Sequence, residues 1–125
     1  MNSENPYILL TEWLEKEAAE IRSIESEAHA ALHERNDDSA YRDLMRSKAM
    51  KLASLAEQSG DIVDVVENNE LRPFIEKINR FSQSAAQSLE VGSVFFMSAL
   101  LYPEEHKEGD PNDLENFIDE LKSLT

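Results

Sequence analysis

Apolar side chains recur at intervals of three and four residues along most of this chain, and this spacing constrains the fold more than any other feature. The first series is set among glutamates and consists of Leu10, Leu14, Ala18, Ile21, Ile24, Ala28 and Leu32. Such spacing places the apolar residues on one face of a helix. Asn5 is a good N-cap and Pro6 suits the first helical position. The pattern predicts a long helix over residues 6–35.

A second series follows the polar run at residues 36–39, whose side chains are good N-caps. It ends at Gly60, a residue that commonly terminates helices. Its apolar face would consist of Tyr41, Leu44, Met45, Ala49, Leu52, Leu55 and Ala56. Because the link to the first helix is short, we expect the two helices to form an antiparallel hairpin.

Three more helices complete the prediction. A short one is expected at residues 62–66, where β-branched residues also permit a strand; we favour the helix because no other segment alternates with a period of two. A second long helix should begin at Pro73 and stop at Pro103, and a short terminal helix should span residues 114–124. The sequence therefore predicts an all-α fold, an up-down helical bundle with two long, one medium and two short helices, in a single domain of residues 1–125.

The net charge of −14 excludes several classes of partner. Residues 1–35 hold 8 acids and 3 bases, and residues 104–125 hold 8 acids and 2 bases, so the two ends contribute −5 and −6. Such a field repels nucleic acids and anionic membrane surfaces, and we expect neither as a partner. The most apolar stretch, residues 91–102, is shorter than the roughly 20 residues of a membrane-spanning helix.

Catalytic motifs are scarce in the sequence. The chain has no cysteine, which excludes disulfides, thiol chemistry and Cys-ligated zinc. Three glycines do not form a phosphate-binding loop or a nucleophile elbow. The N-terminus lacks the basic start and apolar core of a signal peptide, so we expect a cytoplasmic location. These observations favour a non-enzymatic protein without a cofactor.

One carboxylate pattern keeps an enzymatic alternative open. Glu17 and Glu20 form an ExxE pair, and a second acidic element, Glu57 to Asp64, runs into an apolar segment. Together they resemble the MazG-like nucleotide pyrophosphohydrolases. The resemblance implies that Glu17, Glu20, Glu57 and Asp61 bind Mg²⁺ and orient a nucleoside triphosphate for attack by water. Carboxylate oxygens are the ligands that this hard cation prefers.

A second alternative concerns transition metals. Glu25, His29 and His33 are spaced four residues apart, so a helix would bring them to one face. Imidazole and carboxylate groups in this arrangement are possible zinc ligands. The sequence offers these three residues as a candidate metal site.

The leading hypothesis rests on the segment from Val94 to Tyr102, where apolar residues occupy nearly every direction around the predicted helix. Ser84, Ser88 and Gly92 form a track of small residues just before it, which permits close approach of another helix. The terminal helix could cover this segment within one subunit; otherwise a homodimer or another protein must do so. We therefore expect a protein-interaction or assembly module whose interface consists of Ser88, Gly92, Phe95, Phe96, Ala99 and Leu100.

Overall fold

The computed structural model describes residues 6–62 and 69–124, and these residues form helices joined by turns and loops, with no strand among them. The all-α prediction is confirmed. The elements are α1 (Pro6–His33), α2 (Asp38–Ala53), α3 (Leu55–Ile62), the 3₁₀ turn η1 (Asn69–Leu71), α4 (Arg72–Val91), α5 (Val94–Ala99) and α6 (Asp113–Lys122).

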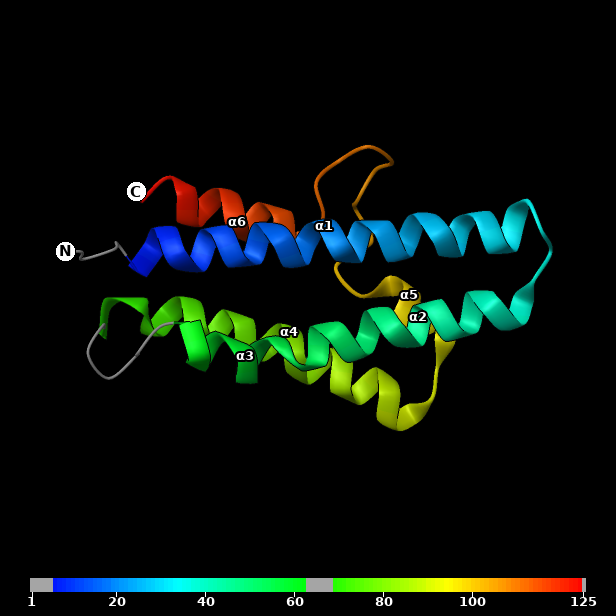
Figure 1. Cartoon of the computed structure of the whole chain (residues 1–125), viewed down its shortest axis with the longest axis horizontal. Helices are drawn as coiled ribbons and strands as arrows, with labels where there is room; N and C mark the ends of the chain where they lie inside the picture. Colours follow the sequence, from blue (N-terminus) through cyan, green and yellow to red (C-terminus); the bar gives the residue numbers. More distant parts are fainter. Residues whose placement is uncertain (1–5, 63–68, 125) are drawn as a thin grey trace.

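The helices α1 and α2 form an antiparallel hairpin that sets the long axis of the molecule (Figure 1). The chain reverses at Asn36, which has the left-handed φ of 52° that Asn tolerates better than most residues. Asp37 then caps α2, because its side chain accepts a hydrogen bond from the amide of Ala40 at 3.0 Å. The polar run at residues 36–39 thus makes the turn.

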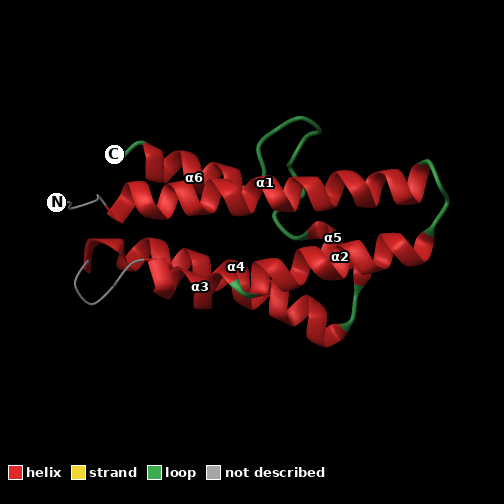
Figure 2. Ribbon diagram, viewed as in Figure 1, coloured by secondary structure: helices red, strands yellow, loops and turns green. Residues whose placement is uncertain are grey.

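The helix α4 packs against α2 and α3, while α6 lies along the N-terminal half of α1 (Figure 1). A loop leads from the end of α5 past α1 to the start of α6 (Figure 2). The main core is built of buried residues from these helices, from η1 and from this loop: Leu10, Leu14, Ala18, Ile21, Leu52, Leu55, Leu71, Ile78, Ala85, Leu101, Leu114, Phe117, Ile118 and Leu121. A smaller cluster of Ala28, Met45, Ala49 and Met97 lies where α5 meets the hairpin.

The predicted second helix is interrupted at Ser54, and Gly60 does not end it but lies inside α3. The cause is a contact from α4. The Ser82 hydroxyl accepts a hydrogen bond from the Ala56 amide at 2.9 Å and donates one to the Leu52 carbonyl at 2.8 Å. These are backbone groups that the interruption leaves in need of partners. The tertiary contact therefore stabilises a break that helical periodicity alone does not indicate.

The prediction of one helix from Pro73 to Pro103 is wrong, since α4 ends at Val91 and the chain turns before α5. Gly92 adopts a left-handed φ of 74° and closes α4 through hydrogen bonds to Ser88 and Leu89. Ser93 then caps α5 by accepting a hydrogen bond from the Phe96 amide at 3.1 Å. A glycine terminator followed by a serine cap overrides the apolar periodicity.

The two short helices have different outcomes. Ile62 is the last residue of α3, and residues 63–66 of the predicted third helix lie outside the described residues. The terminal helix appears as α6, which begins at a capping box. In this box Asn112 accepts from the Glu115 amide and Glu115 accepts from the Asn112 amide, both at 2.9 Å.

Candidate functional site

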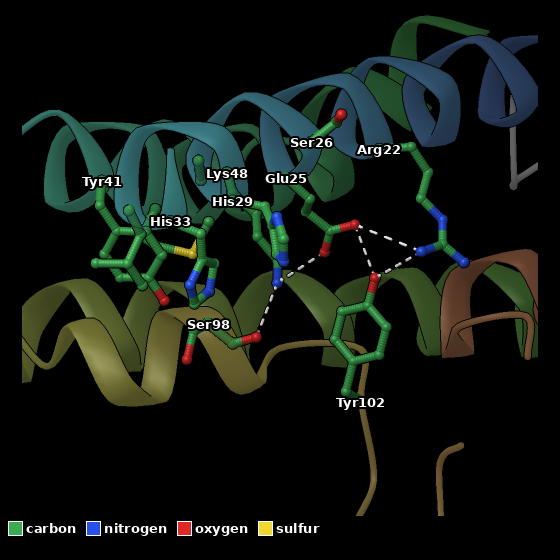
Figure 3. A pocket seen from close by; sticks show the side chains of 12 residues that line it. Arg22, Glu25, Ser26, His29, His33, Tyr41, Lys48, Ser98 and Tyr102 are labelled. Carbon is green, nitrogen blue, oxygen red and sulfur yellow. Dashed lines mark hydrogen bonds and ion pairs between the residues drawn. The ribbon is translucent and has the colours of Figure 1, made fainter. Parts of the chain in front are cut away.

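A cleft of about 390 Å³ lies between α1, α2 and the segment that leads from α5 to Tyr102 (Figure 3). Its lining contains seven titratable side chains from several elements: Arg22, Glu25, His29 and His33 from α1, Tyr41 and Lys48 from α2, and Tyr102. Titratable groups gathered in one cleft often mark a binding or catalytic site.

Lys48 is the most buried of these groups, with 1% of its side chain exposed. Its Nζ forms an ion pair with Glu25 Oε2 at 3.0 Å, donates to the Ser98 carbonyl at 3.1 Å, and lies 5.0 Å from the centre of the Tyr102 ring. Burial lowers the pKa of Lys48, and Glu25 opposes that shift. The partners of the ammonium thus come from α1, α5 and the segment after α5.

Tyr102 connects this pair to Arg22. Its hydroxyl donates to Glu25 Oε1 at 2.7 Å and accepts from Arg22 Nη1 at 3.0 Å (Figure 3). Burial, followed by the hydrogen bond to Glu25, raises the pKa of Tyr102 to about 12. The phenol therefore stays protonated at neutral pH and bridges a carboxylate and a guanidinium.

Arg22 extends the same network to α6. Its Nε and Nη2 donate to the two carboxylate oxygens of Glu115 at 3.0 and 2.6 Å, a bidentate pair. This hydrogen bonding lowers the pKa of Glu115 and raises that of Arg22. Because Glu115 is also part of the capping box of α6, one guanidinium holds the start of that helix against α1.

The network suits a structural role better than a catalytic one. A catalytic lysine needs a face that a substrate can reach, whereas Lys48 is enclosed by the groups that bind it. Its contacts join α1, α2 and the segment at Tyr102, and Arg22 adds α6. We define Arg22, Glu25, Lys48, Tyr102 and Glu115 as the charged network.

The predicted transition-metal set is not assembled. His29 and His33 are both exposed and their ring centres lie 4.4 Å apart, but Glu25 is held by Lys48 and Tyr102 in the charged network. Across residues 6–62 and 69–124, no three His, Asp or Glu side chains are placed to share a metal ion.

The predicted Mg²⁺ ligands do not converge either. Glu17 and Glu20 both bind Lys51 Nζ, at 3.2 and 2.6 Å, so a lysine from α2 occupies the position that the sequence predicts for a metal. Burial lowers the pKa of Lys51, but the hydrogen bonds that its ammonium donates to Glu20 and Glu17 outweigh this effect and raise the pKa overall. Glu57 and Asp61 lie exposed on α3.

The predicted interface is divided by the turn at Gly92. Ser88 is buried and donates to the Ala85 carbonyl at 2.7 Å, and Leu100 packs against both apolar clusters. Gly92, Phe95, Phe96 and Ala99 are exposed. Phe95 and Phe96 expose 73% and 52% of their surface, and Val91 beside them exposes 67%. We define Val91, Phe95 and Phe96 as the aromatic surface.

A groove of about 450 Å³ adjoins the aromatic surface. It runs along the end of α4, and its lining is formed by Ser84, Gln87, Ser88, Glu90, Val91 and Phe96. The small serine side chains of the predicted track leave this space open. Phe95 lies next to the groove, since its ring centre is 5.8 Å from that of Phe96.

Sequence reasoning missed Arg22, Lys48, Tyr102 and Glu115 as members of one network. A signal existed for Lys48, which falls between Met45 and Leu52 on the apolar face of the second helix. A lysine at such a position must find a buried partner. The partners lie far away in the sequence: Ser98 is 50 positions from Lys48, and Tyr102 and Glu115 are 80 and 93 positions from Arg22. A helical period cannot indicate contacts over such separations.

None of the helices in the described part of the chain combines the length and apolarity needed to cross a membrane. No family model matches the sequence, and no curated protein or solved structure is significantly similar to it. The geometry of the chain therefore provides the basis for a functional proposal.

Proposed function

We propose that this chain is a non-enzymatic docking module that binds protein through the aromatic surface. The observation that carries the proposal is the exposure of Phe95 and Phe96, 73% and 52%, on consecutive positions of one short helix. Burying an aromatic side chain of this kind contributes roughly 1.5–3 kcal/mol. Two neighbouring phenyl rings on the surface are a source of binding free energy that the isolated chain does not use.

The local backbone holds these rings in place. Gly92 ends α4, Ser93 caps α5, and Met97 anchors α5 in the smaller apolar cluster with no exposed surface. A surface that is already ordered loses little conformational entropy when a partner binds. Buried Met97 and exposed Phe95 lie on the same short helix. The packing of Met97 therefore fixes the orientation of α5 and directs Phe95 toward solvent.

Neither alternative gains support from the arrangement of its candidate ligands. In the metal hypothesis Glu25 is held by Lys48, and in the pyrophosphohydrolase hypothesis Glu17 and Glu20 are held by Lys51. These carboxylates would have to leave an ion pair before they could bind a metal. The docking hypothesis requires no such rearrangement.

A photo-crosslinking amino acid at position 95 tests the proposal in the cells that produce the chain. We expect covalent adducts with protein at position 95 and none at position 124. Leu124 is also exposed, at 50%, but it lies beside the C-terminus, well away from α5 (Figure 1). Adding Phe96→Glu should abolish the adducts. Equal adduct yields at both positions, or none at position 95, would contradict the proposal.

The variant Phe96→Glu is suited to this test because it should leave the fold intact. Position 96 lies three residues after the cap Ser93, where a glutamate can complete a capping box. A negative charge in the first turn of a helix is also favourable. Lost adducts would therefore report a lost contact and not an unfolded helix, which circular dichroism can verify.

A further inference from the structure

We infer that the partner at the aromatic surface is a second copy of this chain, arranged about a two-fold axis so that Phe95 of each copy enters the groove of the other. The inference rests on the proposed function and names its partner. A closed two-fold contact requires a projection and a matching recess on the same surface. Phe95 and the groove that begins at Phe96 meet this requirement.

The sizes of the projection and the recess are compatible. The groove has a volume of about 450 Å³, and a cavity of about 150 Å³ is enough to hold a benzene ring. Phe95 exposes 73% of its surface and is free to enter such a space. Ser84 and Ser88 along the groove contribute small side chains, which leave room for a phenyl ring where larger residues would fill it.

The distribution of charge favours a second copy over a basic partner. Between Phe81 and Pro103, Glu90 is the only charged residue, whereas the chain as a whole carries −14. A basic protein would gain most by contacting the acidic ends of the sequence. Two copies of an acidic chain would instead meet where few like charges face each other, and Glu90 is the one charged residue among those of the aromatic surface and the groove.

The contact surface is small, so we expect a weak, reversible dimer. The apolar area comes from three side chains per copy, Val91, Phe95 and Phe96. Interfaces that bury less than about 1,200 Å² in total belong to the transient class. Long-range repulsion between two chains of −14 opposes association, and salt screens that repulsion.

Sedimentation equilibrium of the purified full chain tests the inference. We expect a monomer–dimer equilibrium between about 1 μM and about 1 mM protein, with the dimer stabilised as salt rises from about 0.05 to about 0.5 M. A complex with a basic partner would weaken over the same range. Glu90→Gln should strengthen the dimer several-fold, since it removes the carboxylate that lines the groove of each copy.

Phe95→Glu should weaken the dimer about 100-fold, because the two-fold axis removes two buried rings at once. Leu124→Glu adds the same charge at an exposed apolar position far from the groove and should leave the equilibrium unchanged. A monomer at every concentration and salt, or equal effects of the two glutamate variants, would overturn the inference.

The crosslinking experiment separates this failure from failure of the docking function. An adduct of about twice the 14.2 kDa chain mass, formed at position 95, supports the second copy. Adducts with a different protein and none with the chain itself would leave the docking function standing and overturn the two-fold dimer. Absence of any adduct at position 95 would overturn both.

Discussion

Glu25→Gln should lower the free energy of unfolding by about 3 kcal/mol, because it leaves the positive charge of Lys48 buried without its counter-charge. Glutamine keeps the shape and one oxygen to accept from Tyr102, so the change removes mainly the negative charge. Lys48 is 1% exposed and would retain only the Ser98 carbonyl and the Tyr102 ring. Removing one partner of a buried pair typically costs 3–5 kcal/mol, and the remaining contacts place this case at the lower end.

The destabilisation caused by Glu25→Gln should decrease as the pH rises. The pKa of Lys48 is already lowered by burial, and loss of Glu25 lowers it further. Between that folded-state pKa and the ordinary value of 10.5, the unfolded chain binds more protons than the folded chain, so stability increases with pH. The stability difference between Glu25→Gln and the parent chain should therefore be smaller at about pH 9.5 than at about pH 7.

Urea unfolding followed by circular dichroism measures both effects, and heating should show a melting temperature lower by about 10 °C. The double variant Glu25→Gln/Lys48→Met supplies the control, since an uncharged pair should return to within about 1 kcal/mol of the parent. A single variant as stable as the parent would refute the reasoning. So would a double variant less stable than the single one.

Two other predictions concern the tyrosine of the charged network and the glycines of the helices. Ultraviolet titration should show one tyrosine that ionises near pH 12 and is missing in Tyr102→Phe. Because folding raises the pKa of Tyr102, the contribution of this phenol to stability is complete below about pH 10 and is lost as the pH approaches 12. Gly92→Ala should destabilise the chain by about 1 kcal/mol, since φ is 74° there, whereas Gly60→Ala inside α3 should stabilise it by about 0.5–1 kcal/mol. Urea unfolding measures the stability change of each glycine variant. Stability changes of the same sign would contradict the different backbone roles assigned to Gly92 and Gly60.

The helices that could be predicted are those whose ends are marked by local chemistry. The helix α1 begins at Pro6, and α2 begins within the polar run before Tyr41. Both starts are marked by residues that favour the first turn of a helix. The break at Ser54 could not be predicted, because it depends on the hydroxyl of Ser82, which comes from another helix. In the sequence, Gly92 continues a track of small residues that permits close packing, and only its left-handed φ identifies it as the end of α4.

The candidate sites divide in the same way. The exposed rings of Phe95 and Phe96 follow from a segment that is apolar in all directions, which one neighbour cannot cover. The charged network could not be predicted in full, because Arg22 and Glu115 lie far apart in the sequence. Acidic pairs such as Glu17 and Glu20 indicated a metal, but a lysine satisfies them equally well.

The bond between Arg22 and Glu115 also affects how the chain opens. A short C-terminal helix at the surface would ordinarily fray and exchange its amide hydrogens well before the rest of the protein. Here, separating α6 from α1 would break the Arg22–Glu115 pair and expose Leu114, Phe117, Ile118 and Leu121, which are buried in the main core. The amides of α6 should therefore exchange with the same free energy as those in the middle of α1, so that the last helix unfolds together with the first.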